Sequence, residues 1–182
     1  MVIFEKIFFV CYNIFMSSSS DKHNDNFIAG FEPFININST VLILGSFPSV
    51  LSRKNGFYYG NSRNRFWSTL ANIYEEKTPQ TIEEKKRLLT KHNIALWDIV
   101  TKADFKGSSD KVLEKSSFQF ADIEKLLKKY PNIKKIFCNG RLAYKLFKSR
   151  YENSNLTAEY LPSTSPANTR FAPKTWESNL KG

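Results

Sequence analysis

The chain of 182 residues contains little cysteine and little histidine. Its two cysteines, Cys11 and Cys138, are too few for a disulfide-based scaffold and do not have the spacing of metal ligands. With only two histidines, His23 and His92, a histidine-based zinc site and a catalytic triad are both disfavoured. The chain also lacks a glycine-rich phosphate loop of known spacing, which argues against a nucleotide-binding α/β protein.

An apolar run long enough to cross a membrane is also missing, so we expect no membrane partner. The apolar stretch at residues 7–15 is too short, and Asn13 interrupts it. Residues 1–16 are therefore either a weak targeting peptide or the product of a start codon placed before Met16. We expect a cytoplasmic or nuclear protein, with organellar targeting by residues 1–16 left open.

Residues 17–26 (SSSSDKHNDN) are polar and serine-rich, which is typical of a flexible linker. We therefore expect residues 1–26 to form a flexible or targeting segment and residues 27–182 to form a single folded domain. The hydrophobic fraction of 41% and the aromatic fraction of 15% are those of a globular chain that can bury a core.

Acidic residues are outnumbered, with 17 Asp and Glu against 27 Lys and Arg, so the formal net charge is +10. A charge of this size indicates a polyanionic partner such as a nucleic acid, or an anionic membrane surface. The alternative is that the charge serves only solubility in a lysine-rich proteome.

Short apolar runs alternate with helical periodicity along the rest of the chain. The runs predict strands at residues 41–44, 94–100, 133–138 and 158–161. The periodicity predicts helices at residues 66–74, 79–91, 120–130 and 140–150, with Phe120 and Leu142 among the inward residues of the last two. This alternation predicts an α/β domain: a three-layer α/β/α sandwich around a short, mainly parallel four-stranded sheet.

Ligands of such a sheet bind beyond the carboxyl ends of its strands, and residues 45–64 follow the first of them. Gly45 permits a close approach of the backbone. Tyr58 and Tyr59 offer flat faces on which a base can stack, with a place at the rim of the core as the alternative. Asn64 is an amide at the start of a predicted helix, where spacing alone favours a helix N-cap over a catalytic role.

Two more segments follow strands and are expected at the same edge. In residues 98–110, Asp98 and Asp110 could act as a base or stabilise positive charge, or could serve as a strand-end cap and a turn-forming residue. Residues 162–170 are stiffened by prolines and rich in hydrogen-bond donors, which suits phosphate contacts but also an ordinary polar turn. A basic group nearby is placed to meet phosphates: Arg53, Lys54, Arg63 and Arg65.

Four blocks of sequence, taken in order, resemble the uracil-DNA glycosylase superfamily, and most closely its hypoxanthine (deoxyinosine) DNA glycosylase branch. The blocks are LGSFPS at 44–49, YYG at 58–60 with NRFW at 64–67, ALWDI at 95–99 with Gly107, Ser108 and Asp110, and LPSTSPAN at 161–168. The resemblance implies a monofunctional DNA N-glycosylase of base excision repair. It further implies damaged DNA as the partner, deaminated bases with hypoxanthine first as the substrate, and no metal or organic cofactor. A monomer suits an enzyme that scans DNA.

The resemblance also assigns roles to individual residues. Asn64 is implied as the catalytic residue that orients a water, because Phe47 stands where the mismatch-uracil branch carries an asparagine. The backbone of Ser46 and Phe47, beside Gly45, is implied to read the edge of the base, and Tyr59 to stack on it.

DNA contacts are implied for five residues of the last block: Ser163, Thr164, Ser165, Ala167 and Asn168. A DNA contact is also expected for Arg63, from its place in the basic group. Ala167 stands where relatives place a larger wedge, so we expect weaker plugging of the duplex or a contribution from Asn168. Asp98 and Asp110 are implied as supporting residues. A glycosylase that prefers uracil and a catalytically inactive nucleic-acid-binding module remain the alternatives.

Overall fold

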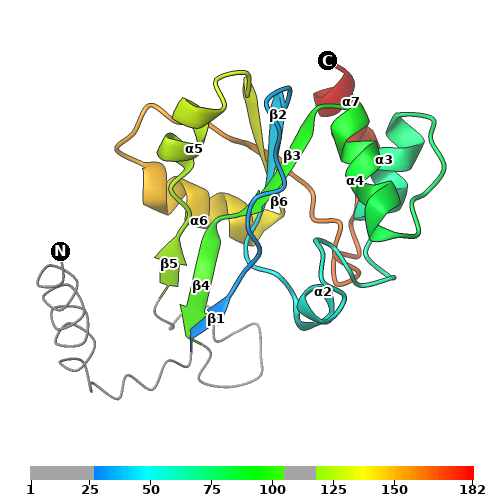
Figure 1. Cartoon of the computed structure of the whole chain (residues 1–182), viewed down its shortest axis with the longest axis horizontal. Helices are drawn as coiled ribbons and strands as arrows, with labels where there is room; N and C mark the ends of the chain where they lie inside the picture. The colour runs from blue at the N-terminus through cyan, green and yellow to red at the C-terminus, as the bar shows by residue number, and fades with distance from the viewer. Residues whose placement is uncertain (1–26, 105–117) are drawn as a thin grey trace, which may run out of the picture.

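The computed structural model describes residues 27–104 and 118–182 (Figure 1). Its central element is a four-stranded parallel sheet. In spatial order the strands are β3 (Ile94–Asp98), β2 (Val41–Gly45), β6 (Lys135–Asn139) and β7 (Glu159–Leu161). All four lie within one residue or two of the predicted runs, so the parallel sheet is confirmed.

Helices cover both faces of this sheet (Figure 1). One face carries α3 (Phe66–Ile73), α4 (Ile82–Lys91) and α7 (Pro173–Lys181). The other carries α5 (Ile123–Lys129) and α6 (Arg141–Tyr151). The three-layer architecture is therefore confirmed. Among the described residues, none of the helices has the length and apolarity needed to cross a membrane.

The unbroken apolar run of β2 is explained by these two helical layers. Successive side chains of a strand point to opposite faces. Ile43 accordingly packs with the α3 side of the core, whereas Leu42 and Leu44 pack with the α6 side, and all three are fully buried. A strand with both faces covered needs apolar residues at every position.

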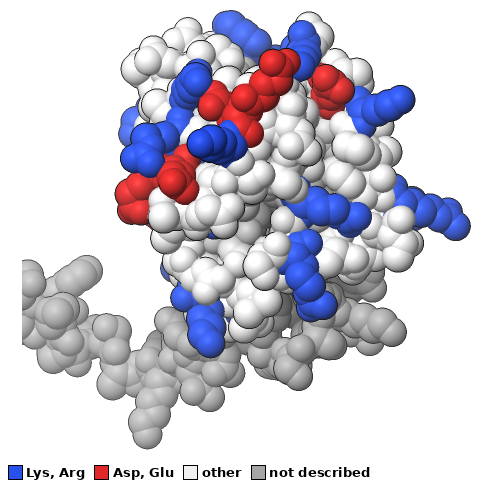
Figure 2. All heavy atoms as spheres, turned by 90° about the vertical axis from the view of Figure 1, so that its right-hand side faces the viewer, with Lys and Arg blue, Asp and Glu red and all other residues white. Residues whose placement is uncertain are grey.

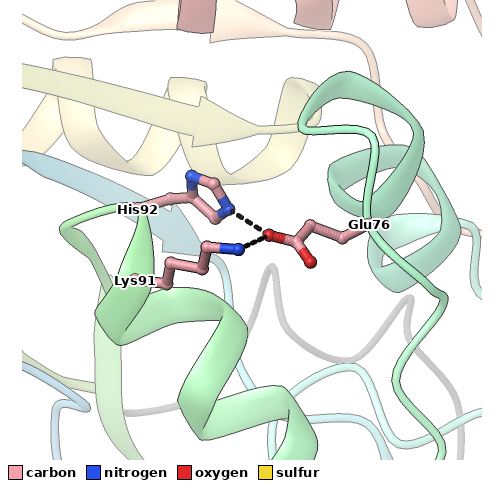
Figure 3. A network of polar contacts seen from close by, with 3 residues as sticks. All are labelled: Glu76, Lys91 and His92. Carbon is pink, nitrogen blue, oxygen red and sulfur yellow. Dashed lines mark hydrogen bonds and ion pairs between the residues drawn. The ribbon is translucent and has the colours of Figure 1, made fainter.

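Of the two histidines, the structure describes His92, whereas His23 lies outside the described residues. His92 links α3 to α4 (Figure 3). Its ring stacks on Tyr74 with the centroids 3.8 Å apart, and its Nε2 lies 3.3 Å from a carboxylate oxygen of Glu76, which also pairs with Lys91. The hydrogen bonds from Lys91 and, to a smaller extent, from His92 hold the pKa of Glu76 below its usual range. His92 precedes the amino end of β3, so it serves packing at the edge opposite the predicted site.

The predicted strand at residues 94–100 is in fact two strands. β3 ends at Asp98, Ile99 interrupts it, and the chain continues as β4 (Val100–Asp104). β4 pairs in antiparallel fashion with β1 (Phe27–Ala29) and β5 (Phe118–Phe120). This second, three-stranded sheet lies below the first in Figure 1 and was not predicted.

Two helix predictions need correction. Phe120 lies in β5, and α5 begins only at Ile123, because the Asp122 side chain accepts a hydrogen bond from the Lys125 backbone at 2.9 Å and starts the helix there. Leu142 is 36% exposed, because the buried stripe of α6 runs through Ala143 instead. The structure also adds a short helix, α2 (Val50–Lys54), within the first loop.

Candidate active site

The carboxyl ends of the parallel strands bring Asp98 together with the predicted loops after β2 and β7. The next strand of the sheet in sequence, β3, lies on one side of β2, whereas the later strands β6 and β7 lie on the other side. The order of the strands therefore reverses between β2 and β6, and sheets of this kind bind ligands in the crevice at that point. Gly45 ends β2 and is in register with Asp98, which ends β3, and Asn139 ends β6. In Figure 1 this edge lies low, beside α2 and the loop that follows β7.

Gly45 is required by the close approach of the Asp98 side chain. A Cβ at residue 45 would lie 2.2 Å from Asp98 Oδ1 and 3.6 Å from the Tyr59 hydroxyl. The close approach predicted at Gly45 is therefore made by the Asp98 side chain. Gly45 and Asp98 are both buried. Together with the Tyr59 hydroxyl they form one contact group at the carboxyl edge of the sheet.

Asp98 is a buried carboxyl group with incomplete hydrogen bonding. It is 5% exposed, and its Oδ2 has no hydrogen-bond partner among the described residues. Burial disfavours the charged form and raises the pKa of Asp98 from its ordinary 3.8 to about 7. A carboxyl group with this pKa can carry or release a proton near neutral pH. The other predicted supporting residue, Asp110, lies outside the described residues, as do Gly107 and Ser108.

The two tyrosines of the first loop have different environments. Tyr58 is 3% exposed and donates a hydrogen bond to the Glu32 carbonyl at 2.8 Å, so it is a core residue rather than a stacking surface. Tyr59 has a positive φ of 50° and stacks on Phe66 with the ring centroids 3.8 Å apart. Its pKa is raised by burial and by the nearby Asp98, against the opposing effect of a hydrogen bond with Asn139. Tyr59 is thus part of the site wall, with one ring face already covered.

Asn64 directly precedes Arg65, which is the N-cap residue of α3, so the N-cap itself lies one residue after Asn64. The Asn64 Oδ1 accepts a hydrogen bond from the Phe66 backbone at 3.0 Å, at the start of α3. Its backbone N–H donates to the Asn61 carbonyl at 2.8 Å, and the residue is half-buried. No partner for its Nδ2 occurs within residues 27–104 and 118–182. The oxygen therefore fixes the orientation of the amide, and the nitrogen is left as a donor.

The loop after β7 is held by hydrogen bonds within the loop and by hydrogen bonds to other elements. Thr164 is fully buried, and its hydroxyl and backbone N–H bond to the Asn139 side chain at 2.9 and 3.0 Å. Asn168 donates to the Ser163 carbonyl at 2.8 Å. Thr164 therefore shapes the loop from inside, and a contact with DNA has to come from its neighbours. Pro166 and Ala167 form an exposed tip.

Two hydroxyl groups stiffen this loop further. Ser163 accepts a hydrogen bond from the Ser165 backbone at 3.2 Å, and Ser165 accepts one from the Ala167 backbone at 3.3 Å. A Cβ at Gly140, where φ is +103°, would lie 2.9 Å from the Ser163 Cβ, so Gly140 lets the loop pack on the end of β6. These contacts keep the short loop in one shape.

Positive charge surrounds this edge. Residues 46–65 and 162–172 together contain five Lys and Arg and no Asp or Glu. Figure 2 shows the face that carries α3 and α4, where Asp and Glu lie in the upper part among Lys and Arg, and the charged side chains visible in the lower part are Lys and Arg. An edge of this charge attracts polyanions.

The basic group predicted from the sequence does not act as one unit. Arg63 is exposed, in line with a phosphate contact. Arg53 instead donates to the Pro48 carbonyl at 2.6 Å and lies over the Phe47 ring. Arg65 also turns inward, toward the loop after β7. Sequence reasoning missed this inward role of Arg65, and it missed Asn139, whose place at the end of a predicted strand was the available signal.

Comparison with known proteins places this geometry in a family. The model of the uracil DNA glycosylase superfamily matches residues 32–180. A curated relative from Methanosarcina acetivorans, named hypoxanthine DNA glycosylase, is 33% identical over 145 residues, which is 79% of this chain and 89% of that protein. Another with the same name, from Methanosarcina barkeri, is 35% identical over 115 residues, which is 62% of this chain and 70% of that protein.

A solved structure agrees with the sequence comparisons. The solution NMR structure of a protein from Methanosarcina acetivorans, assigned as a uracil DNA glycosylase, superimposes with a TM-score of 0.71. It is 30% identical in sequence and matches 86% of this chain and 99% of that chain. The resemblance inferred from the four sequence blocks is confirmed, and this chain belongs to the uracil DNA glycosylase superfamily.

Proposed function

We propose that the protein is a DNA glycosylase that hydrolyses the bond between a deaminated base and its deoxyribose, with hypoxanthine as the preferred base. Two curated relatives named hypoxanthine DNA glycosylase support this substrate. The observation that carries the chemistry is the Asn64 amide, whose oxygen is fixed by the Phe66 backbone and whose nitrogen remains a donor at the carboxyl edge of the sheet. The basic loops around this edge supply the contacts to DNA phosphates.

The reaction begins when the damaged nucleotide leaves the duplex and enters the crevice, at a cost of a few kcal/mol that is smaller for a mispaired base. Ser46 and Phe47 offer backbone groups to the edge of the base, and Gly45 and Tyr59 line the crevice beside them. Asn64 holds a water molecule against the sugar. Arg63, Ser163, Ser165 and the tip at Ala167 contact the DNA, while Asn168 and Thr164 keep the loop in shape.

Bond breaking precedes attack by water in this scheme. The bond from C1′ to the base nitrogen breaks, and its electron pair leaves with the base, so the sugar gains positive and the base negative charge. The oxygen of the held water then bonds to C1′, and a proton of that water ends on the base. Fixed dipoles around the base stabilise the developing anion. The products are the free base and an abasic site, without strand cleavage.

A base-release assay with two substitutions at Asn64 tests this proposal. Duplexes with a single deoxyinosine, uracil or xanthine would be incubated with the protein and treated with alkali to reveal abasic sites. Asn64→Asp keeps an oxygen for the Phe66 backbone but removes the donor, and Asn64→Ala removes both. We expect both variants to lose on the order of 100-fold or more of the hypoxanthine release. Asn72→Ala, at an exposed asparagine of α3, the helix that begins just after Asn64, is the matched control.

The other outcomes separate the alternatives. Release of uracil in place of hypoxanthine would keep the mechanism and change the substrate, in line with the assignment of the solved structure. Salt-sensitive DNA binding without release of any base would leave a nucleic-acid-binding module. Full activity of Asn64→Asp would exclude the amide nitrogen as the group that holds water.

A further inference from the structure

Arg65 differs from its neighbour Arg63 in where its charge is directed. Its terminal nitrogen Nη2 donates to the carbonyls of Ser165 and Asn168, at 2.6 Å each, and its guanidinium lies 4.6 Å from the centre of the Phe171 ring. The backbone N–H of Arg65 donates to the Thr164 carbonyl at 3.0 Å. Arg65 thus donates hydrogen bonds to three backbone carbonyls of the loop at residues 162–168.

Arg65 is itself rigidly attached to the Asn64 motif. It follows Asn64 directly and occupies the position before the first residue of α3. Its carbonyl accepts hydrogen bonds from the Thr69 backbone at 2.8 Å and from the Thr69 hydroxyl at 2.6 Å. A shift of the loop that keeps the guanidinium contacts would therefore have to move the start of α3, and with it the amide of Asn64.

The remaining attachments of the loop do not involve the Asn64 motif. Trp176 donates to the Pro162 carbonyl at 2.8 Å, and Asn139 bonds to Thr164. These bonds hold the first half of the loop to α7 and to β6. The second half, from Ser165 to Asn168, carries the exposed tip, and within the described part of the chain its carbonyl contacts to another element are the two made by Arg65.

We propose that Arg65 is a positioning residue, which holds the tip of the loop in a fixed place relative to the Asn64 amide. This inference rests on the proposed function, because the loop is taken to enter the duplex and Asn64 to hold the water. If Arg65 couples the two, insertion of the loop into DNA also positions the flipped nucleotide over Asn64. The planar guanidinium suits this task, since it can hold two carbonyls and pack on an aromatic ring at once, which a lysine ammonium cannot do.

Arg65→Lys, which keeps the charge and most of the stem, is the test variant, and Arg87→Lys is the control. Arg87 is exposed on α4, so Arg87→Lys makes the same chemical change on a different element, outside the loop and the Asn64 motif. Single-turnover release of hypoxanthine would be measured on a duplex and on the same oligonucleotide as a single strand. A displacement of about 1 Å can cost about 100-fold in rate. A single strand needs no wedge, so we expect Arg65→Lys to lose at least about tenfold more on the duplex.

Amide hydrogen exchange of the DNA-free protein is the second readout. We expect faster exchange in residues 162–171 of Arg65→Lys, and no change in Arg87→Lys. Equal losses on both substrates, or unchanged exchange in the loop, would overturn the proposal, and the thermal midpoint would show whether Arg65→Lys is folded. If the wild-type protein released no base, the proposed function would fail, whereas the exchange experiment would still decide whether Arg65 holds the loop.

Discussion

Replacement of Asp98 by asparagine removes a titratable group from the floor of the site and keeps its size. Burial raises the pKa of Asp98 from 3.8 to about 7, so the folded protein binds a proton that the unfolded chain has already released between these values. Below about pH 4 both states are protonated and the group costs nothing. As the pH rises from 4 to 7, the free energy of unfolding falls, and above pH 7 the loss is complete.

The difference in pKa sets the size of this effect. A shift from 3.8 to about 7 is about three units, and one unit corresponds to about 1.4 kcal/mol, so the wild-type protein loses about 4 kcal/mol. Asp98 is only 5% exposed, so screening by solvent does not reduce this value much. Domains of this size are stable by about 5–15 kcal/mol, which makes the loss easy to detect.

Urea unfolding of the wild-type protein and of Asp98→Asn at pH 4 and pH 8.5 measures the effect. Other groups titrate equally in both proteins, so the difference between them isolates Asp98. We expect the stability of the variant relative to the wild type to increase by about 4 kcal/mol between the two pH values. A relative stability that stays constant within about 1 kcal/mol would refute the reasoning, because it would mean that the ionised carboxyl is accommodated at no cost.

Three further substitutions test the site and its support. Gly45→Ala places a methyl group 2.2 Å from Asp98 Oδ1 and should cost about 1–3 kcal/mol in urea unfolding, and Gly45→Ala combined with Asp98→Ala should recover part of it. Simply additive losses would contradict the clash. Thr81→Ala removes the cap of α4 and should cost about 1 kcal/mol in thermal unfolding while base release stays unchanged. Arg63→Ala should lower the slope of log affinity for DNA against log salt by about one, and an unchanged slope would exclude a phosphate contact.

The parallel sheet was predictable because β2, β3 and most of β6 are buried on both faces, whereas β7 is an edge strand with two exposed residues. Buried strands are unbroken apolar runs, as at residues 41–44, and they differ from the helices in length and period. The second sheet gives no such signal. β4 follows β3 after one residue and contains Lys102, which is exposed, and β1 and β5 have three residues each. Strands this short are defined by their partners in space rather than by their own sequence.

The meeting of Asp98 with the loops after β2 and β7 at one edge was predictable, but the direction of each side chain was not. Arg53, Arg63 and Arg65 are alike in sequence, yet Arg63 is exposed and the other two bond to backbone carbonyls. Thr164 looked like a donor for phosphates and is buried against Asn139. For Thr164 and Arg65 the difference depends on contacts between residues about 25 to 100 positions apart, which local pattern does not contain.

A buried carboxyl group at the floor of the crevice is consistent with the proposed reaction. The leaving base gains negative charge, so an ionised Asp98 beneath Gly45 would raise the barrier by repulsion, whereas the neutral acid would not. With a pKa raised to about 7, about half of the Asp98 carboxyl groups are protonated at pH 7. Burial of Asp98 therefore has two effects. It lowers the stability of the fold at high pH, and it keeps part of the carboxyl groups neutral, which favours departure of the base. Stability and base release should for this reason depend on the ionisation of one residue, which neither a surface carboxylate nor an apolar side chain at residue 98 would provide.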